Sequence, residues 1–308
     1  MLRPLELAIA VLNGAVGDYL ARTGNGLATE FVLAHDGAVL PVDRASLARV
    51  HPNASNRVVV LVHGLMCTED IFRFRDGGDY GSMLERDLGF TPLYVRYNSG
   101  LPIEANGASL ARLLEDVVRE YPVDIEELLL LGHSMGGLVI RSACHAAVEA
   151  GLGWVALAKS AIYIGTPHRG APLERAGRVV SRLLDAIPDP YTRLVAELAE
   201  LRSHGIKDLG DPAHPLPLLP TMRHYLIAGT ISLDPTLTTL FGDAIVPLAS
   251  ATDALLQPQT RGALPPDHVK VFHGINHLGL ATDAKVYEQV RAFASERDAT
   301  LLREESAE

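Results

Sequence analysis

The stretch IEELLLLGHSMGG, residues 125–137, indicates the fold of the chain more clearly than any other. Its first half, Ile125 to Leu131, is a short apolar run of the kind that forms a parallel strand buried on both faces. Its second half fits the pattern G-x-S-x-G from Gly132 to Gly136, and a helical pattern begins at Met135. A strand that turns at once into a helix through a glycine-flanked serine strains the serine backbone and projects its hydroxyl above the sheet edge.

This turn predicts that Ser134 is a nucleophile. The pattern alone is short enough to arise by chance, so the prediction depends on the strand before it and the helix after it. The alternative interpretation is a glycine-rich turn in which Ser134 only caps the following helix. The new helix would also place its first backbone amides, beginning with Met135, near negative charge that develops at the serine.

The rest of the chain alternates between strand and helix patterns. Expected strands cover residues 27–34, 38–42, 57–62, 91–97, 125–131, 161–165, 225–228 and 269–273. Expected helices cover residues 107–120, 135–150 and 283–296. This alternation predicts an α/β fold with a mostly parallel central sheet covered by helices on both faces. No linker divides the sequence, so residues 1–308 are interpreted as a single domain.

Two segments lie outside the alternation. Residues 4–21 have apolar side chains at helical spacing and are expected to form an amphipathic helix, which either covers the domain or contacts a partner. Residues 171–220 contain two helical patterns and a proline-rich stretch but no apolar strand. They are interpreted as a helical lid inserted above the sheet.

An acyl-transfer site needs backbone donors for an oxyanion. One candidate is the N–H of Met135, the residue after the predicted nucleophile. The second is the N–H of Leu65, because His63-Gly64-Leu65 directly follows the buried strand at 57–62. Gly64 would let the chain turn into the site. A plain strand-ending turn is the alternative.

A serine nucleophile also needs a general base. His277 fits this position because it follows the last expected strand and precedes the last helix. His273 and His268 are the alternatives; His273 ends the strand itself, which favours a structural role.

The base in turn needs an acid between the nucleophile and itself in chain order. Asp243, within Gly242-Asp243-Ala244-Ile245-Val246-Pro247, follows the strand at 225–228 and is the first choice. Asp234 is closer to the end of that strand, and Asp253 is a weaker option. A lone aspartate in a loop can also be a turn former.

Three further histidines have expected roles. His133 and His168 are expected to line the site together with Gly64, and His63 is expected to support the turn beside it by hydrogen bonding. No histidine has the acidic spacing of a metal motif such as H-E-x-x-H. The predicted chemistry therefore needs no metal and no organic cofactor.

Composition limits the partners. The 308-residue chain has a formal net charge of −10 and no run of Lys or Arg, which makes nucleic acid an unexpected partner. No stretch of 18 apolar residues is present, so no membrane insertion is expected. Glu6 interrupts the apolar segment 5–14, which makes it a poor signal sequence. Cys67 and Cys144 are expected to be free thiols, which favours a reducing, cytoplasmic location.

Five ordered motifs together resemble the bacterial lipase and esterase branch of the α/β-hydrolases, and the GPI inositol-deacylase-like members of the same superfamily. They are Val62-His63-Gly64-Leu65, Gly132 to Gly137, Gly165-Thr166-Pro167-His168-Arg169-Gly170, Gly242 to Pro247 and Asn276-His277. The resemblance implies an ester hydrolase with the triad Ser134, Asp243 and His277, the oxyanion donors Leu65 and Met135, and a lid over the site.

Three other functions use the same sequence features. A phospholipase or lipase would act at a lipid interface, and micelles would activate it. An acyltransferase would pass the acyl group to an alcohol rather than to water, which product analysis would reveal. A non-catalytic binding protein of this fold would be expected to lack one member of the triad, whereas all three candidates are present.

Overall fold

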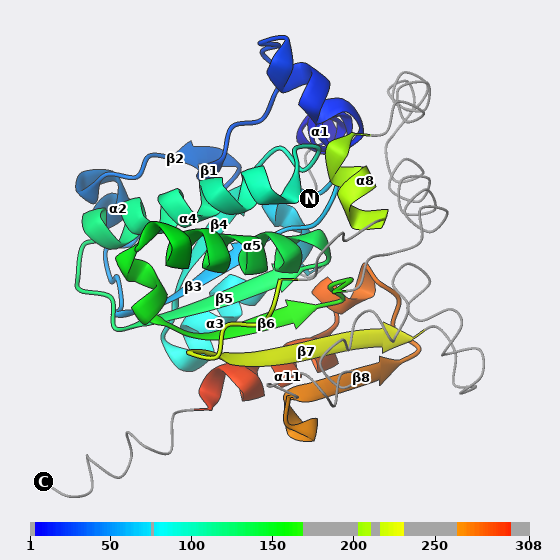
Figure 1. The fold of residues 1–308 in the computed structure, drawn as a ribbon. Helices are drawn as coiled ribbons and strands as arrows, with labels where there is room; N and C mark the ends of the chain where they lie inside the picture. Colours follow the sequence, from blue (N-terminus) through cyan, green and yellow to red (C-terminus); the bar gives the residue numbers. More distant parts are fainter. Residues whose placement is uncertain (1–3, 75–76, 169–202, 211–215, 231–263, 297–308) are drawn as a thin grey trace, which may run out of the picture.

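The computed structural model describes residues 4–74, 77–168, 203–210, 216–230 and 264–296 of the chain. Within these residues eight strands form one sheet in the order β2-β1-β4-β3-β5-β6-β7-β8 (Figure 1). Strand β1 is antiparallel to both of its neighbours, and the other neighbouring strands are parallel. The strands are β1 (Val32–His35), β2 (Ala38–Leu40), β3 (Arg57–Val62), β4 (Thr91–Arg96), β5 (Glu127–His133), β6 (Ala158–Ile164), β7 (Arg223–Thr230) and β8 (Val269–His273).

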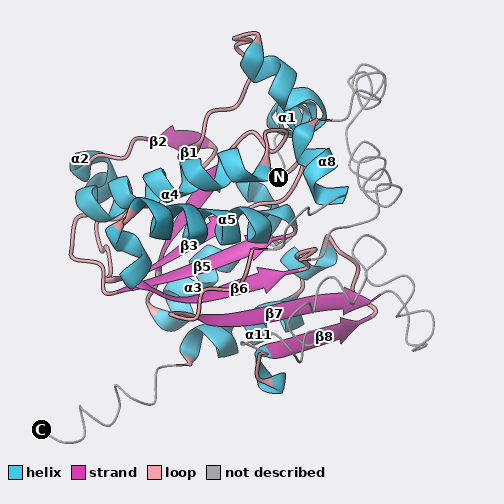
Figure 2. Cartoon of the chain, in the orientation of Figure 1, coloured by secondary structure: helices cyan, strands magenta, loops and turns pink. Residues whose placement is uncertain are grey.

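Helices pack on both faces of this sheet (Figure 2). The helices are α1 (Pro4–Arg22), α2 (Arg44–Val50), α3 (Tyr80–Leu88), α4 (Ile103–Glu120), α5 (Met135–Ala150), α8 (His204–Gly210) and α11 (Ala284–Ser295). Short 3₁₀ turns are η1 (Glu69–Phe72), η2 (Gly153–Ala156), η4 (Pro266–His268) and η5 (Gly279–Ala281). The predicted α/β class with a mostly parallel, doubly covered sheet is confirmed.

The apolar run of β3 shows why the sheet is covered twice. Val58, Val60 and Val62 belong to the apolar core shared with α1, α4 and α5. Val59 and Leu61, which alternate with them, belong to the core shared with α3 and α11. All five side chains are fully buried. Successive side chains of a strand point to opposite faces, so an unbroken apolar run requires a helical layer on each side.

Several expected boundaries were wrong. Residues 27–31 are not part of β1, because the Asn13 side chain of α1 bonds the carbonyl of Leu27 and the N–H of Thr29. Helix α4 begins at Ile103 rather than 107, and β7 extends to both sides of residues 225–228. Helices α2 and α3 were not predicted. Each begins at an aspartate N-cap, Asp43 and Asp79 respectively, which is a readable local signal.

The N-terminal helix is a cover on the domain rather than a free surface helix. Val11, Ala15, Val16 and Leu20 of α1 are buried in the core shared with α4 and α5. Leu5, which was assigned to the same apolar stripe, is exposed. Helix α1 has non-helical backbone angles at Val16, where the helix is kinked.

The order in which strands are added to the sheet reverses between β3 and β5, which makes this the topological switch point. From β3 the chain passes through α3 to β4 on one side, and from β4 it returns through α4 to β5 on the other side of β3. Helices α3 and α4 lie on opposite faces of the sheet. In open α/β sheets the crevice at the carboxyl ends of the strands that flank such a switch point is where ligands bind.

The lid expected at residues 171–220 lies almost wholly outside the described residues. Of this interval only residues 203–210 and 216–220 are described, and α8 lies there beside α1 (Figure 1). Both cysteines are free and buried, as expected. Among the described helices, none combines the length and the apolar character needed to cross a bilayer.

Candidate active site

Ser134 lies at the carboxyl end of β5 with a positive φ of 55° and a ψ of −126°. A positive φ costs a residue with a side chain about 1–3 kcal/mol and persists only when neighbouring structure holds it. The neighbouring structure is the strand pair β5–β6, because the Ser134 N–H donates to the Ile164 carbonyl at 2.8 Å. Helix α5 begins at the next residue, Met135. This is the strand–serine–helix turn that the sequence predicted.

Gly64, at the end of the neighbouring strand β3, lies directly against Ser134. A Cβ on Gly64 would come within 2.9 Å of the Ser134 Cβ, closer than carbon atoms in proteins pack. Strand β3 is paired with β5 up to Val62 and Gly132, so the residues that follow the two strands meet at one edge. The predicted oxyanion loop and the predicted nucleophile are therefore adjacent, at the switch point of the sheet.

The carbonyl of Gly64 is held by two donors. His63 Nδ1 lies 2.8 Å from the Gly64 oxygen, and the Cys67 N–H donates to the same oxygen at 3.4 Å. Burial lowers the pKa of His63 to about 4, so its imidazole is neutral at physiological pH. Because the carbonyl can only accept, Nδ1 carries the single ring hydrogen. The expected supporting role of His63 agrees with this contact.

A trans peptide directs its C=O and its N–H in opposite directions. Fixing the Gly64 carbonyl therefore fixes the Leu65 N–H, since both belong to one peptide plane. Within the described part of the chain, the Leu65 N–H donates to no backbone acceptor. The Met135 N–H is the first of helix α5 and so has no acceptor inside the helix. Both predicted donors thus lie on the segments that meet at Ser134.

His277 is brought to the same place by the loop after β8. It is buried, and a Cβ on Gly165 would lie 3.1 Å from its Nδ1 and Cε1 atoms. Gly165 follows Ile164, the residue that accepts the Ser134 N–H. The alternative His273 is exposed and contacts Thr230, and the alternative His268 lies at the opposite, amino end of β8. Of the three histidines, the structure places His277 beside the segment that holds Ser134.

His133 contacts the predicted base. Its Nε2–H donates to the His277 carbonyl at 3.1 Å, and the two rings lie with centroids 4.9 Å apart. The side chain is 1% exposed. His133 was expected to line a substrate site; here it lies against the backbone and ring of His277.

His168 lies in a buried polar cluster above helix α5. Arg141 Nη1 donates to its Nδ1 at 2.6 Å, and its ring meets Tyr163 edge-on. Burial, together with the Arg141 charge, lowers the pKa of His168 well below its ordinary value, so the ring is neutral. Arg141 and Tyr163 belong to no recognisable motif, so this cluster could not be predicted from local sequence patterns.

The predicted acid, Asp243, and its alternatives Asp234 and Asp253 lie outside the described residues. Among the residues that are described, no group of three His, Cys, Asp or Glu side chains could hold a metal ion. The structure therefore brings together Ser134, Gly64, Leu65, Met135, His133 and His277, and places His168 nearby on the loop after β6.

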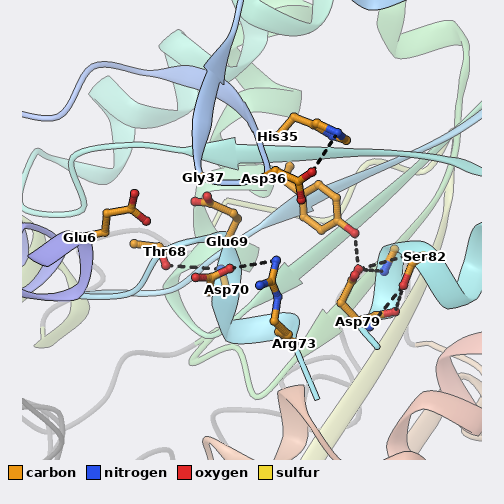
Figure 3. A network of polar contacts seen from close by, with 12 residues as sticks. Glu6, His35, Asp36, Gly37, Thr68, Glu69, Asp70, Arg73, Asp79 and Ser82 are labelled. Carbon is orange, nitrogen blue, oxygen red and sulfur yellow. Dashed lines mark hydrogen bonds and ion pairs between the residues drawn. The ribbon is translucent and has the colours of Figure 1, made fainter. Parts of the chain in front are cut away.

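A surface cavity of about 420 Å³ lies elsewhere, between the β1–β2 turn, η1 and α3. Three polar contacts join residues that line it: His35 with Asp36, Asp70 with Arg73, and Asp79 with the Tyr94 hydroxyl (Figure 3). No residue predicted for the site lines it.

No protein-family model matches the chain, and no curated protein sequence matches it. Solved structures do resemble it. RedJ shares 18% identity at a TM-score of 0.50, over 79% of this chain and 94% of that protein. A Bacillus licheniformis lipase in its mature form shares 18% identity at a TM-score of 0.48, over 77% of this chain and 90% of the lipase. An esterase from Pyrococcus furiosus shares 13% identity at 0.48, over 78% and 82%.

At these identities the resemblance concerns the arrangement of the chain and not its chemistry. The likeness to RedJ is to the overall arrangement of strands and helices described above. The chain therefore has the α/β-hydrolase fold.

Proposed function

We propose that the protein is a serine hydrolase that cleaves carboxylic esters, with Ser134 as its nucleophile. One observation carries this proposal: Ser134 is held at positive φ between the predicted oxyanion loop and the loop of His277. A structural serine in a turn does not need a strained backbone, nor a glycine packed against its Cβ. Strained residues of this kind are concentrated at functional sites.

The reaction takes place in two halves. His277 accepts the Ser134 hydroxyl proton while Oγ attacks the ester carbonyl carbon, whose π electrons move to the oxygen. The N–H groups of Leu65 and Met135 bind that oxyanion. The tetrahedral intermediate collapses, the bond to the alcohol breaks, and the imidazolium gives its proton to the leaving alcohol. Water then attacks the acyl-enzyme with His277 as base, releasing the acid and restoring Ser134.

Asp243 is proposed to orient His277 by accepting the N–H of the ring nitrogen that does not face Ser134. In this scheme Gly64 leaves room for the nucleophile, and His133 positions His277 through its carbonyl. His168 is assigned to the wall of the site. No step requires a metal or an organic cofactor. On the resemblance of its motifs, we further assign the protein to the lipase and esterase branch marked by Gly165-Thr166-Pro167-His168-Arg169-Gly170. Residues 171–220 are proposed to form a lid.

The first test is hydrolysis of p-nitrophenyl esters from acetyl to palmitoyl by wild type and by Ser134→Ala. We expect wild-type turnover and a loss in the variant of at least about a thousandfold, because the nucleophile supplies the acyl-enzyme route. A preference for long chains with activation by micelles would favour a lipase or phospholipase, and acyl transfer to added alcohols would favour an acyltransferase. Wild-type inactivity on every ester, or full activity of Ser134→Ala, would overturn the proposal.

The same assay decides which carboxylate serves His277. Asp243→Asn is expected to lower kcat by about 10⁴-fold, as the loss of the orienting carboxylate does in other triads. The matched variants Asp234→Asn and Asp253→Asn are expected to keep their activity. A large loss in either of these instead would assign the acid to that residue.

A further inference from the structure

The loop after β3 contains a second strained residue, Met66. It is fully buried and has φ +59°, and it is one of three described residues other than glycine with a positive φ. The Cys67 N–H donates to the Gly64 carbonyl, so Leu65 and Met66 are the central residues of a four-residue turn. Glycine is the usual residue at the second central position of such a turn when φ is positive. Something outside the turn must hold Met66.

Ser99 supplies one of the holding contacts. The Met66 N–H donates to the Ser99 Oγ at 2.9 Å. Ser99 is 1% exposed and follows β4, the strand beside β3. A buried N–H that loses its acceptor is destabilising, so this contact has a strong influence on the direction of the Leu65–Met66 peptide.

Helix α1 supplies the other contact. A Cβ on Gly14 would come within 2.2 Å of the Met66 Cγ and 3.0 Å of its backbone nitrogen, so the helix backbone lies directly on Met66. Asn98 Nδ2 in turn donates to the Gly17 carbonyl, and the Ser203 hydroxyl donates to the Gly14 carbonyl. Helix α1 is therefore fixed at the residue that contacts Met66 and again about one turn later.

An ion pair fixes α1 to the segment just beyond the loop. Arg96 of β4 pairs with Glu69 of η1, and its Nη2 lies 3.8 Å from Glu6 of α1. Figure 3 shows Glu6 and Glu69, the two carboxylates that approach Arg96. The loop of residues 63–68 is thus enclosed by α1, by the end of β4 and by η1.

Leu65 lies between two peptide groups that are both held. The Gly64–Leu65 peptide is fixed by His63 and Cys67, and the Leu65–Met66 peptide is fixed by Ser99. A rotation of the Leu65 N–H would have to break the first pair of bonds, and the hydrogen bond from Met66 to Ser99 opposes rotation of the second peptide.

We propose that Ser99 is a positioning residue of the oxyanion hole, acting through Met66, and that α1 is the wall against which Met66 is held. This inference rests on the proposed function of Ser134 and Leu65. It assigns to the N-terminal helix a role in the transition state, although no residue of α1 touches the reacting atoms. Ser99 acts by holding the Leu65 N–H in place before substrate arrives, so that no reorganisation is needed during the reaction.

The test compares Ser99→Ala with Ser99→Thr on the best ester substrate. Removing an oxyanion donor outright costs about 10²–10³ in kcat, so misplacing it is expected to lower kcat by about 10- to 100-fold with KM changed less than about twofold. Threonine keeps the hydroxyl acceptor and is expected to restore most of kcat. Ser160→Ala is the matched control, because Ser160 is 2% exposed but lies at the amino end of β6.

Two further readouts separate positioning from simple loss of stability. Affinity for an alkyl trifluoromethyl ketone, which forms a tetrahedral adduct with a serine, is expected to fall in proportion to kcat in Ser99→Ala. Native-state hydrogen exchange of the Met66 amide is expected to accelerate in Ser99→Ala and to remain slow in Ser99→Thr and Ser160→Ala. A change of KM alone would contradict the inference.

The outcomes are distinguishable. If wild type hydrolyses esters and Ser134→Ala does not, but Ser99→Ala keeps its kcat, the positioning role is wrong and the proposed function stands. If wild type hydrolyses no ester, the proposed function fails and the inference fails with it. If Ser99→Ala does not fold, Gly14→Ala replaces it, since the added methyl presses on Met66 from α1; an unchanged kcat there would also overturn the inference.

Discussion

At the scale of single residues, the candidate site depends on backbone segments that pack too closely to leave room for a side chain. Ser134 and Met66 are held at positive φ, and glycines stand where the backbone leaves no room for a Cβ. The strain at Ser134 comes from pairing with β6 on one side and the start of α5 on the other. Ser134, the proposed nucleophile, is therefore held in position by its backbone.

Gly136 tests this close packing. A Cβ there would lie 2.2 Å from the Val62 carbonyl oxygen and 2.5 Å from that of His63, both backbone atoms that cannot move aside. Gly136→Ala is expected to lower the free energy of unfolding by about 2–3 kcal/mol, because helix α5 must move away from β3. Urea denaturation measures this change.

The matched control is Gly26→Ala, since a Cβ on Gly26 would meet nothing within 4 Å. This variant is expected to unfold at nearly the same urea concentration as wild type. Equal stabilities for Gly136→Ala and Gly26→Ala would show that α5 does not need its present closeness to β3.

At the scale of elements, the helices are positioned by their first residues as much as by their apolar faces. Asp79 caps α3 by accepting the N–H groups of Gly81 and Ser82, and Ser82 returns a bond to the Asp79 backbone. The same carboxylate accepts the Tyr94 hydroxyl of β4 (Figure 3). One side chain thus begins a helix and attaches it to the sheet.

Asp79→Ala removes both contacts at once. Loss of a cap alone costs about 1 kcal/mol, and the half-buried Tyr94 hydroxyl loses a charged partner, so a total loss near about 2 kcal/mol is expected. Asp79→Asn should retain most of the stability, because an asparagine oxygen caps nearly as well and still accepts from Tyr94. Thermal unfolding of the two variants measures the difference; similar losses in both would mean that the negative charge, rather than the two hydrogen bonds, stabilises this corner.

At the scale of the whole molecule, buried neutral histidines link stability to pH. Burial lowers the pKa of His224 from 6.5 to about 4, as it does for His63. His224 uses both ring nitrogens: Nε2–H donates to the Leu219 carbonyl and Nδ1 accepts the Tyr163 hydroxyl. Between pH 6.5, the ordinary pKa of histidine, and pH 4, the unfolded chain binds a proton at this residue that the folded protein does not bind. The contribution of each histidine to the free energy of unfolding is therefore complete above pH 6.5 and is lost as the pH falls towards and past 4.

At pH 4 the free energy of unfolding is lower by about 3 kcal/mol for each of these two histidines, His224 and His63. His224→Gln keeps a donor and an acceptor but cannot take up a proton. Its urea midpoint is expected to depend less steeply on pH between 6.5 and 4 than that of wild type. His273→Gln, which removes an exposed histidine, is the control. Identical slopes for wild type and His224→Gln would show that His224 is not the group responsible.

The sequence by itself determined the local elements of the fold, namely the alternating strands and helices and the turn at Ser134. Unbroken apolar runs such as 58–62 predicted buried parallel strands, and the glycine-flanked Ser134 predicted the strand-to-helix turn. These signals are local: a residue's neighbours in the chain are also its neighbours in the element, so pattern and periodicity suffice. Boundaries were less certain, because the bonds of residues such as Asn13 to residues 27–29 join segments that are distant in the sequence.

Only the tertiary structure decided which residues meet at the carboxyl edge of the sheet. It placed His277 rather than His268 beside the Ser134 segment, turned His133 towards His277, and brought α1 and Ser99 onto Met66. No local pattern encodes these contacts, since they depend on strand order and on loops that converge from separate parts of the chain. A hydrogen bond between residues 33 positions apart, like that between Met66 and Ser99, exists only because two neighbouring strands end at the same edge.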